Sequence, residues 1–394
     1  MEQNRKLQSG FTTGTCAAAA AKAAARILLS GEKVESASLF LPGGDEVTFP
    51  VIVDEISSEA VSCAVKKDAG DDPDVTHGAL IYARVSRKEV SGDMSAASWN
   101  LTSAITDKPC YRSEEFPFLF LTGGAGIGIV TKKGLACEPG YYAINPVPRS
   151  MIFHETADVC LAYKGQRNEV FLIEIWIPAG VRLAEKTFNP KLGIQGGISV
   201  LGTTGVVNPM SAQALIETIR LEIRVKAAEG KEVLAVAPGN YGESFLEESL
   251  GVSMDYFIKC SNFIGDTFLM LREAHISRVL LAGHIGKLIK VAGGVLNTHS
   301  AYGDRRMEIF SECGRIAGFS ADDMDKLLLM NTTEEAADYL NQLGCLDRVT
   351  AVILKRIQIV LGEHSGITPE IVLFSGSGVL GMTAGAVEYI KKIT

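Results

Sequence analysis

The sequence has no Cys-x-x-Cys pair, and this absence argues against a structural zinc site. Its eight cysteines are scattered over 394 residues, at positions 16, 63, 110, 137, 160, 260, 313 and 345. We expect each of them to be a buried, reduced thiol. We therefore predict that the protein holds no metal ion of its own.

Long apolar runs and an excess of basic residues are also missing. No apolar run reaches the roughly 18 residues of a membrane span, and the N-terminal segment lacks the apolar region of a secretory signal. Lys and Arg number 38 against 46 Asp and Glu, and the net charge of −8 argues against a general nucleic-acid binder. We expect a soluble, cytoplasmic protein with neither a nucleic-acid nor a membrane partner, and leave open whether it forms a homo-oligomer.

Two common nucleotide signatures are absent from a loop that otherwise has the features of a ligand site. Gly202-Thr203-Thr204-Gly205 follows a short apolar run, Ile198–Leu201, and precedes a helical pattern that starts near Ser211. The order of strand, glycine turn and helix is typical of ligand-binding turns in open parallel sheets. However, the loop has neither the Gly-x-Gly-x-x-Gly spacing of a dinucleotide site nor the Lys-Ser/Thr ending of a P-loop. It indicates a ligand without identifying it.

The apolar pattern predicts two domains of different class, α+β and α/β. Residues 1–190 contain an alanine-rich helix over 11–31 and then alternate like mostly antiparallel strands, with a turn at Pro42-Gly43-Gly44. Residues 191–394 show the βαβ rhythm of a Rossmann-like parallel sheet, with a helical C-terminal extension inserted near 300–365 and a last strand, Glu370–Phe374, that rejoins the sheet. The other predicted parallel strands are Ile198–Leu201, Val233–Ala237, Tyr256–Cys260 and Val279–Ala282, with helices near 211–228, 242–250 and 263–275.

The turns after the parallel strands are predicted to share one edge of the sheet and to form a cleft there. Polar side chains follow each of the four strands. The rim of the cleft is predicted to carry Thr203, Thr204, Asn240, Asn262, Asp266, His284 and Lys287.

The start of the alanine-rich helix and one acidic loop each allow two interpretations. Thr12, Thr13 and Thr15 either belong to a tightly packed core helix or form an anion site at its N-terminus. Cys16 follows them without a base nearby in sequence, so we do not predict a nucleophile. The acidic loop is either a solvated turn or needs a cation, backbone donors or a ligand against charge repulsion. Its carboxylates are Asp68, Asp71, Asp72 and Asp74.

A second glycine loop, Gly123–Gly128, follows the buried strand Phe116–Leu121, and no long amphipathic helix follows it. We interpret Gly124 and Gly126 as a backbone floor that approaches a large flat ligand. Lys132, Lys133 and Arg149 are predicted to bind carboxylates on that ligand. The prolines at 146 and 148 predict an extended path around Arg149.

Six of these stretches, in this order, resemble the cobalt-precorrin-5B C1-methyltransferases of anaerobic cobalamin biosynthesis, and the match runs nearly end to end. The stretches are Gly10–Ala19, Lys67–Thr76, Gly123–Gly128 with Thr131–Leu135, Ala143–Arg149, Gly202–Ser211 and Ala282–Leu288. The resemblance implies transfer of a methyl group from S-adenosylmethionine to C1 of a cobalt-containing tetrapyrrole. It implies cobalt-precorrin-6A as the product and cobalt only as part of the substrate.

The residues can be assigned to this chemistry as expectations. For the S-adenosylmethionine site we expect Gly202, Thr203, Thr204, Gly205, Asn240, Asn262, Asp266 and Gly283. For the tetrapyrrole we expect Thr12, Thr13, Thr15, Asp71, Asp72, Gly124, Gly126, Lys132, Lys133, Arg149 and Lys287, most of them in the domain over 1–190. His284 either orients a carboxylate or handles a proton, or it is a helix-start residue bonded to backbone.

Two other functions stay open beside the methyltransferase. The parallel sheet and its glycine turns are compatible with a nucleotide-dependent oxidoreductase, although the dinucleotide spacing is missing. A non-catalytic tetrapyrrole-binding protein would bind the macrocycle without affinity for S-adenosylmethionine.

Overall fold

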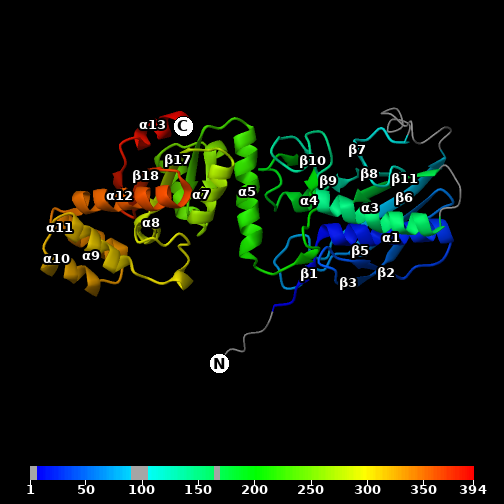
Figure 1. Ribbon diagram of the computed structural model, residues 1–394, viewed down its shortest axis with the longest axis horizontal. Coiled ribbons are helices and arrows are strands. Elements are labelled where there is room, and N and C mark those ends of the chain that lie inside the picture. The colour runs from blue at the N-terminus through cyan, green and yellow to red at the C-terminus, as the bar shows by residue number, and fades with distance from the viewer. Residues whose placement is uncertain (1–6, 90–104, 164–168) are drawn as a thin grey trace, which may run out of the picture. The chain divides into compact units, whose positions relative to one another are not determined.

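The computed structural model describes residues 7–89, 105–163 and 169–394 and divides the chain into two compact units, Met1–Ser211 and Ala212–Thr394 (Figure 1). Each unit has a hydrophobic core of its own. The boundary lies further along the chain than residue 190, where we predicted it, so residues 191–211 belong to the first unit. Part of the predicted strand-and-loop region over 79–112, residues 90–104, lies outside the described residues.

A six-stranded sheet forms the centre of the first unit. Its strand order is β4-β5-β6-β11-β8-β7, and every neighbouring pair is antiparallel except β11 with β8. The predicted α+β class with mostly antiparallel strands is therefore confirmed. The strands are β4 (Ile52–Ile56), β5 (Ala60–Lys66), β6 (Leu80–Glu89), β7 (Cys110–Arg112), β8 (Leu119–Gly123) and β11 (Glu169–Trp176).

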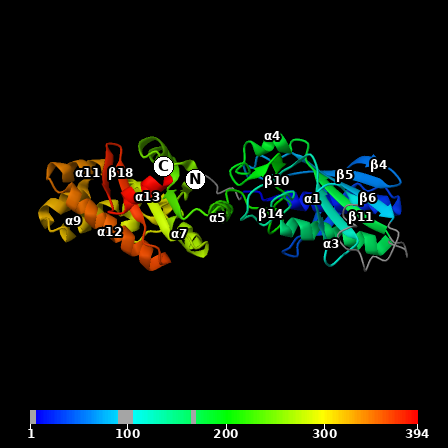
Figure 2. The same ribbon diagram turned by 90° about the horizontal axis from the view of Figure 1, so that it is seen from above.

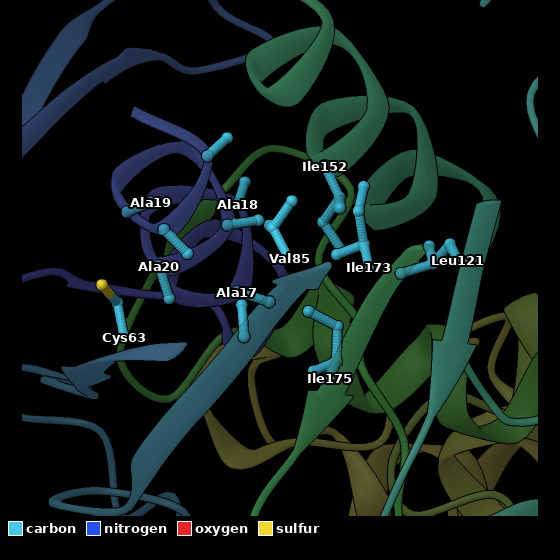
Figure 3. Close-up of a cluster of buried hydrophobic side chains, with 14 of the residues drawn as sticks. Ala17, Ala18, Ala19, Ala20, Cys63, Val85, Leu121, Ile152, Ile173 and Ile175 are labelled. Carbon is cyan, nitrogen blue, oxygen red and sulfur yellow. The ribbon is translucent and has the colours of Figure 1, made fainter. Parts of the chain in front are cut away.

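Two helices, α1 (Thr13–Ser30) and α3 (Pro146–Tyr163), pack against each other and against this sheet. The helix predicted over 11–31 is confirmed: α1 starts after a threonine cap, Thr12, and stops at Gly31, which has a φ of 73°. Ala17 to Ala21 are all 0% exposed. Figure 3 shows Ala17 to Ala20 in one cluster with Val85 and Ile152. Methyl side chains let α1 lie closer to α3 and to the strands than larger side chains would.

The first unit also contains short two-stranded sheets beside the central sheet. The predicted hairpin around Pro42-Gly43-Gly44 forms between β2 (Ser36–Phe40) and β3 (Glu46–Pro50). The other pairs join segments that are distant in sequence, which the pattern of residues did not predict. They are β1 (Gly10–Phe11) with β14 (Val206–Val207), β9 (Gly126–Ile127) with β13 (Gly197–Ile198), and β10 (Ile129–Val130) with β12 (Ile194–Gln195).

The second unit is built on a five-stranded sheet in the order β16-β15-β17-β18-β19, whose first four strands are parallel. The predicted parallel sheet and the return of the final strand to it are confirmed. β19 is antiparallel and was not predicted. The strands are β15 (Val233–Ala237), β16 (Phe257–Lys259), β17 (Arg278–His284), β18 (Glu370–Ser375) and β19 (Gly378–Met382).

Helices cover both faces of this second sheet (Figures 1 and 2). Alternate strand residues point to opposite faces, so Val236 and Leu281 belong to one core while Ala235 and Leu280 belong to another. The first core is closed by α5 (Ala212–Ala228), α7 (Ile264–Glu273), α8 (Ile285–Ala292) and α12 (Leu346–Ser365), and extended by α9 (Arg306–Ile316), α10 (Ala321–Asp325) and α11 (Thr333–Gln342). The second core is closed by a π-helical turn (Phe245–Ser249) and α13 (Ala386–Ile393), and α6 (Gly239–Ser244) precedes that turn. The predicted helical region over 300–365 is present.

The strand order reverses between β15 and β17. From β15 the chain moves outward to β16 and then returns to the other side of β15 to form β17. At such a switch point the connections leave in opposite directions, and ligands of open α/β sheets bind outside the carboxyl ends of these strands. Within the described ranges, no helix combines the length and the apolar character needed to cross a membrane.

Candidate functional site

Three of the six stretches meet at the start of α1. The backbone N–H groups of Thr12 and Gly14 donate to the carbonyl oxygens of Gly205 and Leu201, each at 3.1 Å. Just before them, Phe11 N donates to the Asp68 carbonyl oxygen at 2.7 Å. The stretches that begin at residues 10, 67 and 202 therefore form one contiguous part of the first unit.

The segment Ile198–Leu201 is not a strand of the parallel sheet, so the prediction that the loop 202–205 follows one of its strands was wrong. Its preceding segment, Ile198–Leu201, belongs to the first unit, where Gly197–Ile198 pairs with β9. Gly202 has a φ of 138°, and a Cβ at this position would lie 2.2 Å from Thr12 Oγ1. Glycine is needed here because the loop packs directly against the helix cap. Thr203 and Thr204 remain exposed on this loop.

The hydroxyl groups of Thr12 and Thr15, at the start of α1, form hydrogen bonds within the protein. Thr12 Oγ1 accepts from Thr15 N at 3.2 Å, and Thr15 Oγ1 donates to the Gly205 carbonyl oxygen at 2.8 Å. Thr15 is 0% exposed and Thr13 is 4% exposed. Thr12 and Thr15 therefore hold the loop against the helix, which favours the packed-helix interpretation over an open anion site.

The acidic loop is held mainly by backbone donors. Asp71 Oδ2 accepts from Gln8 N at 2.7 Å, and Asp72 Oδ1 accepts from Met210 N at 2.9 Å. Asp68 Oδ1 accepts from Gly70 N at 2.9 Å. The first two bonds connect the loop to the segment before α1 and to the segment after the loop 202–205, so Asp71 and Asp72 have a structural role in the first unit.

The fourth carboxylate of this loop, Asp74, is paired with a buried lysine. Lys67 is 2% exposed, and its Nζ lies 2.5 Å from Asp74 Oδ2. Burial alone would raise the pKa of Asp74, but the Lys67 ammonium and hydrogen bonds from Lys67 and Thr76 lower it below its ordinary value. The cation that the crowded carboxylates needed is thus Lys67, which the sequence analysis did not single out.

The glycine loop 123–128 is close-packed rather than an open floor. A Cβ on Gly126 would lie 1.9 Å from the Ile177 carbonyl oxygen, and one on Gly124 would lie 2.6 Å from Glu174 Oε1. Both glycines are buried. Gly126 is needed for the close approach of the segment that follows β11, and Gly124 packs against side chains of β11 itself, which corrects the prediction that the two glycines face a flat ligand.

Arg149 lies in the first turn of α3 and not on an extended path. Proline suits the first turn of a helix because the N–H that it lacks has no partner there, and α3 begins at Pro146. The Arg149 guanidinium carbon lies 4.0 Å from the centre of the Tyr111 ring, and its Nε is buried without a hydrogen-bond partner in the described part of the chain. Lys132 packs along Gly193, and Lys133 is exposed.

In the second unit, three of the four predicted turns share the carboxyl edge of the parallel sheet. Asn240 follows β15, Asn262 follows β16, and His284 ends β17. Asn240 is exposed, as is Asp266 in the first turn of α7. Gly283 is buried, and a Cβ on it would lie 2.7 Å from Leu288 Cγ, so it serves close packing under α8.

His284 is the cap of α8 and is engaged on both ring nitrogens. Its Nδ1 accepts from Gly286 N at 3.2 Å, and its Nε2 lies 3.1 Å from Glu334 Oε1. The first bond leaves the ring proton on Nε2, so Nε2–H donates to Glu334. Of the two interpretations, the helix-start residue bonded to backbone is the one that the geometry favours. Glu334 was missed because it belongs to α11, far along the chain.

Lys287 also lies at this edge. Its Nζ donates to Asn262 Oδ1 at 2.5 Å. Burial, together with the nearby Lys290 ammonium, lowers the pKa of Lys287. A lysine with a neutral partner and a neighbouring cation is suited to an anionic ligand.

Cys16, which follows the threonines of the α1 cap, is not an activated nucleophile. Burial raises the pKa of Cys16 to about 12, so it is a thiol and not a thiolate near neutral pH. In the three described ranges, no group of His, Cys, Asp and Glu is arranged to hold a metal ion.

The family comparisons agree with the resemblance drawn from the six stretches. A family model described as CbiD matches residues 1–209, and one described as CbiD, C-terminal domain, matches residues 297–384. A solved structure of the cobalamin biosynthesis protein CbiD from Archaeoglobus fulgidus is 25% identical, covers 73% of this chain and 80% of its own, and has a TM-score of 0.37. That score is too low to support an argument about shape.

Relatives named cobalt-precorrin-5B C(1)-methyltransferase match this chain along most or all of its length. The relative from Ruminiclostridium cellulolyticum is 39% identical over 100% of this chain and 97% of its own length. The relative from Thermoanaerobacter sp. strain X514 is 42% identical over 87% and 85%, and that from Clostridioides difficile is 38% identical over 94% and 93%. With a family model over more than half of its length and relatives aligned from end to end, the chain belongs to the CbiD family.

Proposed function

We propose that this protein transfers a methyl group from S-adenosylmethionine to C1 of cobalt-precorrin-5B, giving cobalt-precorrin-6A in anaerobic cobalamin biosynthesis. The observation that carries the proposal is the end-to-end similarity to relatives named for this reaction, 39% over the whole chain in one case. The open α/β sheet of the second unit, with its switch point, is an architecture that binds small adenosyl ligands.

The carboxyl edge of the second unit's sheet is the proposed S-adenosylmethionine site. Asn240 and Asn262 follow neighbouring strands there. The Asn240 amide supplies a donor and an acceptor for adenine or ribose, and the Asn262 amide nitrogen supplies a donor, since its oxygen accepts from Lys287. Asp266 adds an exposed carboxylate at the start of α7. The loop 202–205 follows no strand of this sheet and is not part of the proposed site.

The macrocycle carries several acetate and propionate carboxylates and needs cationic partners. Arg149 is the strongest proposed partner, since Tyr111 fixes its guanidinium while Nε has no acceptor from the described residues. Lys132 and Lys133 remain proposed contacts from the loop after β10. Thr203 and Thr204, exposed on the loop 202–205, are proposed ligand donors, while Thr12 and Thr15 hold that loop against α1.

The reaction does not require a nucleophile from the protein. S-adenosylmethionine supplies a methyl group on a sulfonium, the ring carbon C1 supplies the electron pair for the new bond, and the electrons of the broken carbon–sulfur bond stay on sulfur. The protein's residues bind and align the two reactants, and alignment of this kind can lower a barrier by roughly 7–11 kcal/mol in the best cases. The buried, protonated cysteines fit this scheme.

The test is a complete assay with purified protein, S-adenosylmethionine and cobalt-precorrin-5B, read by mass spectrometry. We expect the macrocycle to gain the mass of one methyl group and S-adenosylhomocysteine to appear in equal amount. No gain of mass with substrate of confirmed integrity would reject the proposal. Calorimetry separates the alternatives, because an oxidoreductase would bind NAD(P) and a carrier would bind the macrocycle without S-adenosylmethionine.

A further inference from the structure

Helix α8 presents two lysines on one side. Lys287 and Lys290 are three residues apart, a spacing that makes side chains neighbours on a helix surface. Lys290 is 7% exposed, so most of its side chain is withdrawn from solvent. Lys287 is half-buried. Lysine is among the residues least often buried unless it has a charged partner.

Neither lysine has a carboxylate partner among the described residues. Lys287 Nζ donates to the amide oxygen of Asn262 at 2.5 Å, and Lys290 Nζ donates to the carbonyl oxygen of Gly303 at 3.2 Å. Each ammonium group carries three N–H donors. Among the described residues, each ammonium group donates to one neutral oxygen.

The acidic residue that Lys290 influences is already neutralised. Asp304 accepts from Arg306 through Nε at 2.7 Å and through a terminal nitrogen at 2.5 Å. These Arg306 bonds come first among the causes that lower the pKa of Asp304, and Lys290 contributes only at longer range. Among the described residues, therefore, neither ammonium group on α8 has a carboxylate of its own.

Burying an ammonium group without an anion is unfavourable, and a neutral oxygen offsets only part of the lost hydration. The pair also sits where the fold places ligands. Lys287 is in the first turn after β17, and its partner Asn262 follows β16, both at the carboxyl edge of the parallel sheet. Thr298, which is 2% exposed, adds a hydroxyl 3.4 Å from Asn262 Oδ1.

We propose that Lys287 and Lys290 form a carboxylate-binding subsite at this edge, with Asn262 positioning the Lys287 ammonium. The inference rests on the proposed function, which offers two sources of a carboxylate. One is the amino-acid end of S-adenosylmethionine, and the other is an acetate or propionate of the macrocycle. In both cases the bound anion supplies the negative charge that the two lysines lack among the described residues.

Titration calorimetry on the full-length protein distinguishes the two sources with paired probes. S-adenosylhomocysteine is compared with 5′-methylthioadenosine, which keeps the nucleoside and thioether but lacks the carboxylate. Cobyrinic acid, a stable cobalt macrocycle with free acetate and propionate groups, is compared with its methyl ester. The variants are Lys287→Gln and Lys290→Met, and the control is Lys355→Gln, which removes one positive charge from the exposed face of α12.

We expect both variants to lower the affinity for one of the two acids by roughly tenfold to a hundredfold, as for the loss of a charge-assisted hydrogen bond. Affinity for the matching carboxylate-free probe, and all affinities of Lys355→Gln, should stay unchanged. Loss of S-adenosylhomocysteine binding identifies the cofactor's carboxylate, and loss of cobyrinic acid binding identifies the macrocycle's. Lys290→Met should unfold at the same or a higher temperature, because it removes a buried charge.

Three results would overturn all or part of the inference. If the wild type binds S-adenosylhomocysteine and neither variant changes any affinity, the subsite is wrong while the proposed function stands. If the wild type binds neither acid, both the subsite and the proposed function fail. A Lys290→Met variant that unfolds at a lower temperature with unchanged binding would show that Lys290 serves only the packing of the loop that carries Gly303.

Discussion

At the scale of single residues, the acidic loop depends on one ion pair. Lys67 is 2% exposed, and its ammonium lies against Asp74, whose side chain keeps 25% of its exposure. The other carboxylates of the loop are held by backbone N–H groups. Removing Asp74 would leave a buried cation alone, whereas removing one of the others would leave only an unpaired N–H near solvent.

We predict that Asp74→Asn destabilises the protein by about 3 kcal/mol, the lower end of the range for an uncompensated buried charge because Asp74 is partly exposed. The measurement is chemical denaturation near neutral pH. Asp72→Asn is the matched control, since its amide oxygen still accepts from Met210 N, and it should cost no more than about 0.5 kcal/mol. Equal losses in the two variants would contradict this account.

The same pair predicts how stability changes with acid. The lowered pKa of Asp74 means that the folded protein holds its proton less tightly than the unfolded chain. The stabilisation is therefore fully present above the unfolded pKa of about 3.9 and is lost as the pH falls through the lower folded pKa. Wild-type stability should fall more steeply than that of Asp74→Asn below about pH 4, measured by denaturation across that range.

Residue-level prediction from sequence succeeded where local chemistry decides. Thr12 and Gly31 bound α1 because capping and left-handed backbone are local preferences. It was wrong for Gly124 and Gly126, because glycine is favoured both where a ligand approaches and where another backbone does, and only the packed neighbours distinguish the two. Arg149 was misplaced because the two prolines suit a first helical turn as well as an extended chain.

At the scale of elements, the close packing of α1 depends on the small size of its side chains. Its alanines are buried between α3 and the strands β5 and β6, and Figure 3 shows Ala18 beside Val85. The position of the helix is therefore set by methyl groups, and the close approach that they permit leaves no room for a larger residue.

We predict that Ala18→Leu destabilises the protein by about 1–3 kcal/mol or prevents folding, because the added carbons must displace a close-packed neighbour. Arg26→Leu introduces the same side chain on the exposed side of α1 and should change stability by less than about 0.5 kcal/mol. Thermal unfolding followed by circular dichroism compares the two. A tolerated Ala18→Leu would mean that α1 is not closely packed.

The elements of the second unit were predictable and one segment before them was not. Its parallel strands are short apolar runs separated by helices, and this alternation predicts a parallel sheet. They are β15, β16, β17 and β18. Ile198–Leu201 has the same composition, but Gly197–Ile198 pairs with β9 in the first unit. The sequence of a four-residue apolar run does not identify the strand with which it pairs, because pairing between segments far apart in the chain is decided by tertiary contacts.

At the scale of the whole molecule, the eight cysteines share low exposure to solvent. Seven are buried and Cys110 is half-buried. Burial raises the pKa of Cys260 to about 12 and that of Cys110 to about 11. In both units the thiol is therefore the stable form well above neutral pH.

We predict that native protein reacts slowly with a thiol reagent at a pH near the ordinary thiol pKa of about 8.5, with Cys110 reacting first. In guanidinium chloride all eight should react rapidly, since unfolding restores solvent to each sulfur. The measurement is absorbance of the released thiolate, and Cys110→Ser should remove the first phase. Several fast thiols in the native state would contradict the burial described above.

The pairing of β1 with β14 has a consequence for synthesis of the protein. Gly10 and Phe11 bond to Val207 and Val206, near the end of the first unit. Ribosomes add roughly 5–20 residues per second, so these two residues wait on the order of 10–40 s for their partners. During that interval the nascent chain carries an unpaired strand beside an unclosed helix cap, and the first unit is completed only when its end has been translated.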